Sequence, residues 1–203
     1  MLKPEDITFE LVREIGTDIR VHGNGFLQVN LPDNQRVHLF GHPDLPRQAV
    51  PTPVHDHTWG FESRILCGLL INLVWGFSED EFGGPHTHYV CKYEPTVGED
   101  TRLIPIEQHT GYLTLLARGC FRADGSYTHY RGVLHETFSN EPTITLMTKN
   151  DMPDEGEVVP APRVLCRIGK EPDNSFTRYD LDESQLWAIL KDAFTFVQRV
   201  ATD

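Results

Sequence analysis

Runs of apolar residues separated by turn-forming residues predict that most of this chain folds into short β-strands. Residues 26–31 and 36–40 flank a polar tetrapeptide and are expected to pair as a hairpin across it. A longer apolar run at about 62–76 is expected to form one or two buried strands. Further strands are expected at about 86–94, 102–106, 112–117, 128–130, 135–138, 143–148, 164–168 and 176–179.

Helical spacing of apolar residues occurs at the two ends of the chain. Residues 4–15 begin with proline and two acidic residues and carry apolar side chains at four-residue intervals, which predicts a short amphipathic helix that ends at Gly16. The sequence DESQ at 182–185 is typical of a capping box, and an apolar stripe follows it. This apolar stripe is expected to pack either on a β-barrel formed by the predicted strands or on a second subunit, so a homodimer is an open alternative.

The length and the order of these elements favour a single all-β domain over residues 1–203. A chain of 203 residues can bury a substantial core and is short for two domains. We assign the N-terminal helix to 1–20, a β-barrel to 21–180 and the C-terminal helix to 181–203.

Composition and charge narrow the classes of partner. The chain has 30 acidic residues against 18 lysines and arginines, which gives a formal net charge of −12. This balance argues against binding nucleic acid or an anionic membrane surface, since phosphate recognition depends on clustered positive charge. No apolar stretch is long enough for a transmembrane helix. The four cysteines form no CxxC pair and no secretory segment opens the chain, so we expect reduced thiols in a cytoplasmic protein.

The clearest candidates for chemistry are His55 and His57. In an extended strand, side chains two residues apart share a face, so both imidazoles would point the same way. Neutral imidazoles side by side are good ligands for a transition metal. Glu62 lies an odd number of residues farther on and would face the opposite side of a straight strand. We expect a bend or bulge at Gly60 that turns Glu62 toward the histidines.

Simpler interpretations exist for the same residues. The histidines could be ordinary hydrogen-bonded residues of a barrel without a metal, and Glu62 could orient a ligand or a water without binding the ion. A second HxH pair, His86 and His88, follows Gly-Gly-Pro, and solvent-facing strand histidines are its simpler interpretation.

The pattern around the first histidine pair continues in a second segment. Glu62 follows His57 after four residues and Gly68 follows after five more, and a later GVLH ends in His135. This order resembles the two-part motif of the cupin superfamily. The resemblance implies a cupin double-stranded β-helix, a jelly-roll barrel, that holds one divalent metal ion through His55, His57, His135 and Glu62.

Within the cupins, the closer resemblance is to thiol dioxygenases of the cysteine dioxygenase type. The matching words are HDHT at 55–58, GVLH at 132–135 and NEPTITL at 140–146. The resemblance implies a site in which three histidines, His55, His57 and His135, hold iron.

The substrate side of that family is matched less closely. Its Ser-His-Tyr set falls on Thr145, Met147 and Lys149, so the set is absent here. The resemblance therefore implies the metal site without implying a thiol substrate. Arg20, just before a Gly-Asn-Gly turn, is similar in position to the family's carboxylate-binding arginine, and Arg64 shares strand parity with Glu62. We take these two arginines as the candidate substrate-binding residues.

The preferred interpretation is a mononuclear non-haem Fe(II) dioxygenase acting on a small metal-chelating molecule, with Glu62 as a candidate catalytic carboxylate. If Glu62 binds the ion, Mn, Ni or Zn would suit Lewis-acid chemistry of an isomerase, lyase or hydrolase. A non-enzymatic ligand-binding cupin is the other alternative.

Overall fold

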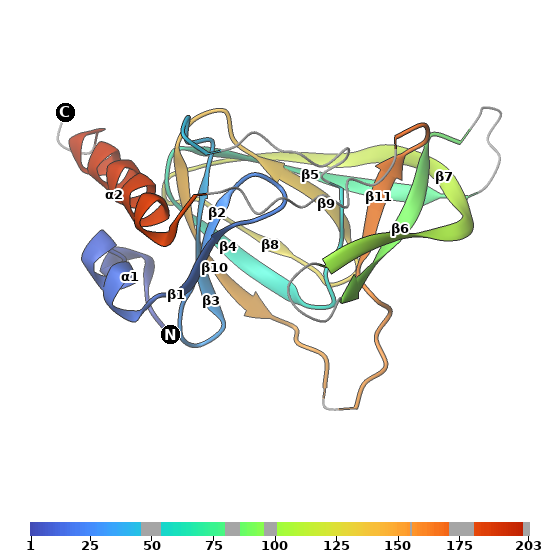
Figure 1. Ribbon diagram of the computed structural model, residues 1–203, viewed down its shortest axis with the longest axis horizontal. Helices are drawn as coiled ribbons and strands as arrows, with labels where there is room; N and C mark the ends of the chain where they lie inside the picture. Colours follow the sequence, from blue (N-terminus) through green and yellow to red (C-terminus); the bar gives the residue numbers. More distant parts are fainter. Residues whose placement is uncertain (46–53, 80–85, 96–100, 155, 171–180, 201–203) are drawn as a thin grey trace.

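The computed structural model describes residues 1–45, 54–79, 86–95, 101–154, 156–170 and 181–200 (Figure 1). Two antiparallel sheets form most of this part of the chain, and two α-helices pack at one end. The elements are η1 (Pro4–Asp6), α1 (Phe9–Ile15), β1 (Thr17–Val21), β2 (Leu27–Asn30), β3 (Gln35–Phe40), β4 (Gly60–Cys67), β5 (Leu69–Ser78), β6 (His88–Pro95), β7 (Thr101–Arg122), β8 (Ser126–His129), β9 (Leu134–Phe138), β10 (Thr143–Asn150), β11 (Arg163–Arg167) and α2 (Glu183–Val200).

The first sheet has the strand order β1-β2-β3-β10-β4-β8. Alternation along its strands separates two environments, since successive side chains of a strand point to opposite faces. On β3, Val37 and Leu39 join the core under the helices, whereas Arg36, His38 and Phe40 line a cavity on the other face. The side chains that β3 points away from the helices are therefore the ones available to a site.

The second sheet has the strand order β11-β6-β7-β5-β9, and residues 54–56 join its two edges. His55 exchanges backbone hydrogen bonds with His135 of β9, with N···O distances of 3.0 and 2.8 Å. On the other side, Leu165 of β11 donates its N–H to Val54 at 2.9 Å. The segment before β4 thus closes the second sheet and carries its histidines against β9.

Both helices cover the outer face of the first sheet (Figure 1). Val12 of α1 and Leu190 of α2 are fully buried in one cluster with Val29, Val37 and Leu39. Full burial of each such side chain contributes about 1.5–3 kcal/mol. The helices therefore stabilise the sheet from outside and leave its inner face to the cavity.

The predicted hairpin and the predicted C-terminal cap are confirmed. β2 and β3 pair antiparallel across the turn that the sequence places at 32–35. At the start of α2, the Asp182 N–H donates to Gln185 Oε1 and the Gln185 N–H donates to Asp182 Oδ1, both at 2.8 Å. These reciprocal bonds are those of a capping box.

Two sequence predictions differ from the structure in extent. The N-terminal helix was assigned to 1–20, but it ends at Ile15, and residues 17–21 form β1 because they pair with β2. The strands expected at 102–106 and 112–117 are one strand, β7, whose first part pairs with β6 and whose last part pairs with β5. The edge strand expected at 176–179 lies outside the described residues.

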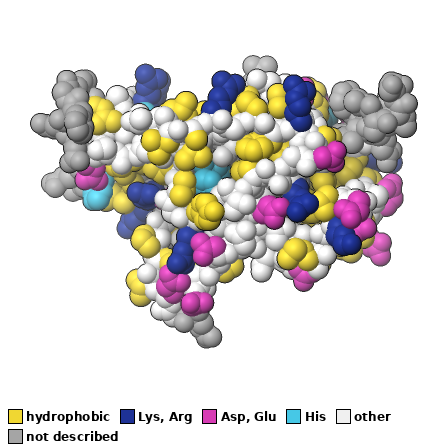
Figure 2. Space-filling view, turned by 180° about the vertical axis from the view of Figure 1, so that it is seen from behind, with side chains coloured by type: hydrophobic (Ala, Val, Ile, Leu, Met, Phe, Trp, Pro, Cys, Tyr) yellow, Lys and Arg dark blue, Asp and Glu magenta, His cyan; other side chains and the backbone are white. Residues whose placement is uncertain are grey.

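The surface shows no separation of charge on the face in Figure 2, where acidic and basic side chains are interspersed. In the part of the chain that the structure describes, no helix has the length and apolar character needed to cross a membrane.

Candidate metal centre

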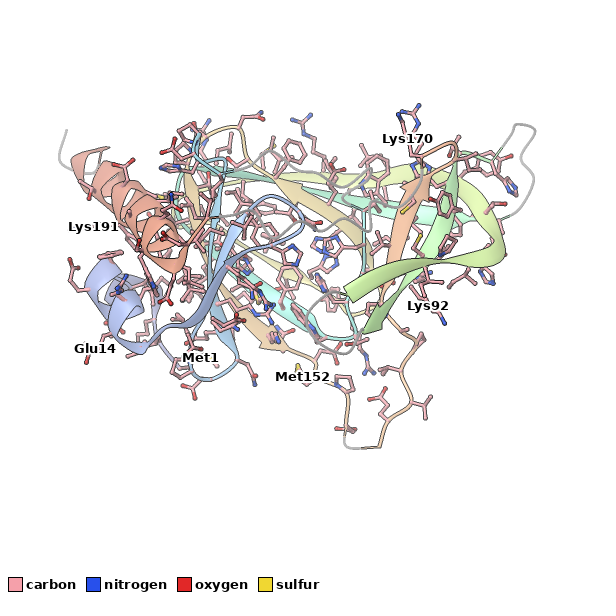
Figure 3. The ribbon with its side chains drawn as sticks, viewed as in Figure 1. Met1, Glu14, Lys92, Met152, Lys170 and Lys191 are labelled. Carbon is pink, nitrogen blue, oxygen red and sulfur yellow. The ribbon has the colours of Figure 1, made fainter. Side chains whose placement is uncertain are left out.

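Three histidines from distant parts of the chain meet between the sheets. His55 and His57 precede β4, and His135 lies on β9. The backbone pairing of His55 with His135 joins the two segments, and the two-residue spacing keeps His57 on the same side as His55. One ligand nitrogen of each ring lies within 4.8 Å of the other two. Figure 3 shows nitrogen-bearing side chains gathered in this interior region.

The spacing of the nitrogens suits a shared ion. His57 Nε2 and His135 Nε2 lie 3.1 Å apart. Two imidazole nitrogens that bind one ion at right angles, each at about 2.1 Å, would be separated by about 3 Å. Since the group also has the ligand type that divalent transition metals prefer, it could hold a metal ion.

The contacts of His135 Nδ1 favour one tautomer of the ring. Nδ1 lies 3.1 Å from Asn72 Oδ1 and 3.2 Å from Thr137 Oγ1, and the amide oxygen can accept a hydrogen bond from a proton on Nδ1. The Nε2 lone pair then points to the other histidines and is free for a metal. Asn72 Oδ1 also accepts a hydrogen bond from Thr137 Oγ1 at 2.9 Å, which holds the amide in this orientation. Such a partner behind a ligand orients the ring.

Burial keeps these imidazoles neutral. It lowers the pKa of both His57 and His135 well below the ordinary value, and the neighbouring histidines lower both further. A neutral imidazole is the form that binds metal, so the site does not require the histidines to lose a proton near neutral pH.

An ion pair between the buried Asp56 and the partly exposed Arg163 ties the two histidine segments together. Asp56 accepts hydrogen bonds from the backbone N–H of Arg163 at 2.6 Å and from its Nε at 2.7 Å. Arg163 Nη2 reaches the carbonyl of Gly132 at 3.2 Å, and the Gly132 N–H donates to the His57 carbonyl at 2.9 Å. The residue between the two histidines therefore anchors them to β11 and to the turn before His135.

The histidines form one wall of a small cavity of about 60 Å³ between the sheets. Its other walls combine aromatic side chains with polar ones from several strands, and no aspartate or glutamate is among the described residues that line it. The aromatic lining is Phe26, Phe40, Trp59, Phe61 and Tyr127. This volume has room for several water-sized groups, which suits a ligand of a few heavy atoms.

The prediction that Glu62 faces the metal is wrong. His55, His57, Trp59, Phe61 and Ser63 all line the cavity, so the two-residue alternation runs through Gly60 without a reset. Glu62 lies on the opposite face of β4, where its Oε1 accepts a hydrogen bond from the Arg64 Nε at 2.9 Å. This carboxylate is neither a ligand nor a partner of the ligands.

Gly60 serves a different purpose from the one expected. A Cβ at this position would lie 2.7 Å from Asn150 Oδ1 and 3.0 Å from the His129 carbonyl. The glycine allows β4 to approach its neighbours closely, and it does not turn the strand over.

The two arginines proposed for substrate binding also lie outside the cavity. Arg64 pairs with Glu62 on the outer face of β4, and Arg20 pairs with Asp18 at 2.9 Å with about half of its side chain exposed. Arg36 is the arginine that lines the cavity. A signal for it existed in the sequence, because Arg36, His38 and Phe40 alternate with two aliphatic residues along a predicted strand.

Sequence reasoning also missed the residues that surround the histidine group. His129 is buried, stacks on His135 with ring centroids 4.0 Å apart, and has its Nε2 engaged by the Val133 carbonyl at 2.9 Å. His22 lines the cavity. Its pKa is lowered to about 3, mainly by burial and to a smaller extent by the nearby His55. Neither residue lies in a motif, so only the fold brings it to the site.

The all-β fold and the buried histidine group define a β-rich protein with a candidate three-histidine metal centre. Comparison with protein-family models gives no match to this chain, and comparison with curated proteins gives no significant match.

Proposed function

We propose that this chain is a metal-dependent protein of the cupin type and that it acts as a mononuclear Fe(II) dioxygenase on a small metal-chelating anion. The observation that supports this most directly is the convergence of His55, His57 and His135 within 4.8 Å. A set of three neutral ligands leaves coordination positions for a substrate and O₂ and leaves the full +2 charge of the ion uncompensated.

The residues around the site have separable roles in this proposal. Bound iron would supply redox chemistry and attract an anionic donor atom. Asn72 holds the His135 ring with Nε2 toward the ion, and Asp56 keeps the two histidine segments in register. Five aromatic side chains form most of the apolar part of the cavity wall. Arg36 supplies positive charge on the cavity side of β3.

The outward position of Glu62 weakens the four-ligand alternative. A Lewis-acid site of that kind was expected to use this carboxylate, which instead pairs with Arg64 on the outer face. The three-histidine interpretation therefore has the stronger support. A protein that binds a ligand without catalysing a reaction is what the oxygen-uptake test would indicate if no compound is consumed.

The proposal is tested by oxygen uptake of the Fe(II)-loaded protein with thiols, diketones and hydroxy acids. Uptake that saturates with one of these classes is expected. We expect cysteine to be a poor substrate, because the Ser-His-Tyr set of the thiol dioxygenases falls here on Thr145, Met147 and Lys149. Uptake by none of the compounds would contradict the dioxygenase, and efficient turnover of cysteine would show that the absent residues are dispensable.

A further inference from the structure

Two buried polar atoms on the paired strands β3 and β10 have no hydrogen-bond partner among the described residues, namely His38 Nε2 and Thr145 Oγ1. His38 is 9% exposed and lines the cavity, and Thr145 is fully buried. The two residues are direct partners in the pairing of β3 with β10, so their side chains lie next to each other on one face. Because buried polar atoms are nearly always paired, this pair indicates a place where a polar group of a ligand binds.

Positive charge lies beside this pair, and the nearby carboxylate of Asp18 pairs with Arg20 instead of Arg36. Arg36 is two residues from His38 on the same face of β3, and its polar contact is a long one, 3.4 Å to Gln28 Oε1. Within the described residues it makes no ion pair. The Arg36 Cζ and the Lys149 Nζ lie 5.5 and 4.8 Å from the ring centroid of Trp59. In a chain with a net charge of −12, this is a local excess of positive charge.

Arg36, His38 and Thr145 can all donate a hydrogen bond. A guanidinium offers a planar fork of N–H groups, a threonine hydroxyl offers one O–H, and a neutral imidazole offers one N–H. Oxyanions, and carboxylates above all, match such a set in charge and geometry. The small volume of the cavity limits the molecule to a few heavy atoms.

We propose that Arg36, His38 and Thr145 form a subsite for the carboxylate of a small ligand whose other end reaches the three histidines. The metal end of this ligand rests on the proposed function. The carboxylate end rests on the two unpaired polar atoms and on Arg36, and it can be tested in the protein without metal.

Two threonines of β10 provide a matched test of the hydroxyl. Thr143 and Thr145 are both fully buried, but Thr143 Oγ1 has partners, including the Leu69 N–H at 3.1 Å and Ser139 Oγ at 2.9 Å. Thr143→Val should therefore lower the melting temperature. Thr145→Val should leave the melting temperature unchanged or raise it, because it removes an unpaired buried hydroxyl. The same change should weaken binding of the probe, glycolate, by about tenfold.

Two arginines provide a matched test of the charge. Arg36→Met and Arg20→Met each remove one positive charge, but Arg20 is exposed and pairs with Asp18. Glycolate binding, followed by isothermal titration calorimetry on protein with and without Fe(II), should weaken about tenfold or more for Arg36→Met and change little for Arg20→Met. Glycolamide, which has the same shape without the charge, should bind more weakly than glycolate to the wild-type protein.

The outcomes separate this inference from the metal proposal. If no metal binds but glycolate still depends on Arg36 and Thr145, the subsite stands and the proposed function fails. If the metal binds but glycolate is indifferent to both substitutions, the subsite is wrong and the metal centre is unaffected. A melting temperature that falls for Thr145→Val as much as for Thr143→Val would show that the hydroxyl is already satisfied, which would also overturn the subsite.

Discussion

Two sides of the cavity are encoded in different ways. The histidine side uses residues of two short motifs, which backbone pairing and the Asp56–Arg163 ion pair hold together. The β3 side of the cavity uses Arg36 and His38, which belong to no motif and reach the cavity through strand alternation. A motif can therefore identify the metal ligands of a site. The groups that would select a bound molecule are identified only when it is known which face of each strand points into the cavity.

The largest effect is expected on metal affinity when one of the three histidines is removed. His135→Ala should reduce metal affinity by well over the 10- to 100-fold that follows loss of a hydrogen-bond partner behind a ligand, because it removes a ligand atom. Competition with a chelator measures the change. His109→Ala is the control, since His109 is exposed and pairs with Glu79. Equal metal affinity of His135→Ala and the wild-type protein would show that the histidine group does not bind the metal.

The ion pair behind the histidines should matter for stability. Asp56→Ala removes two short hydrogen bonds to Arg163 from a buried carboxylate and should lower the free energy of unfolding by about 3 kcal/mol. Urea unfolding of the metal-free protein measures this. A loss below about 0.5 kcal/mol, as is usual for a surface substitution, would show that the ion pair does not hold the two segments together.

The partner behind His135 should have an intermediate effect. Asn72→Ala removes the acceptor that favours a proton on His135 Nδ1, and metal affinity should fall by about 10- to 100-fold. Thr137→Val, which removes the second donor to Asn72 but leaves the amide oxygen, is the conservative comparison and should cost less affinity. The same chelator competition gives both numbers, and an unchanged affinity for Asn72→Ala would contradict the role of the amide.

The smallest effect is expected for the carboxylate on the outer face. Glu62→Gln should change metal affinity by less than about twofold and stability by less than about 0.5 kcal/mol, because its partner Arg64 is more than half exposed. A loss of metal affinity comparable with that of Asn72→Ala would show that Glu62 reaches the ion after all.

The sequence predicted a mostly β chain and the first two histidines of the group because both depend on short-range patterns. Alternating apolar runs predicted β2, β3 and β10, and the spacing of His55 and His57 predicted two imidazoles on one side of the chain, although this segment precedes β4 and is not itself a strand. The later histidine was found through its resemblance to a known motif. Its contact with the first pair depends on long-range backbone pairing, which no local pattern specifies.

The wrong predictions for Glu62, Arg20 and Arg64 relied on local sequence, whereas tertiary packing determines where these side chains point. Gly60 was expected to turn Glu62 inward, but it only makes room for Asn150 and the chain at His129. Arg20 and Arg64 were chosen by position relative to motifs, yet both form exposed ion pairs. The alternation along residues 36–40 places Arg36 on one of the two faces of β3, and the helices that cover the other face identify its face as the inner one.

The metal stoichiometry of the purified protein tests the three-histidine centre most directly. Protein loaded anaerobically with Fe(II) and freed of excess metal should retain about one ion per chain by elemental analysis, whereas a His55→Ala/His57→Ala/His135→Ala variant that keeps the wild-type circular dichroism spectrum should retain almost none. Wild-type protein that retains no metal, or a triple variant that retains as much as the wild type, would contradict the proposed centre.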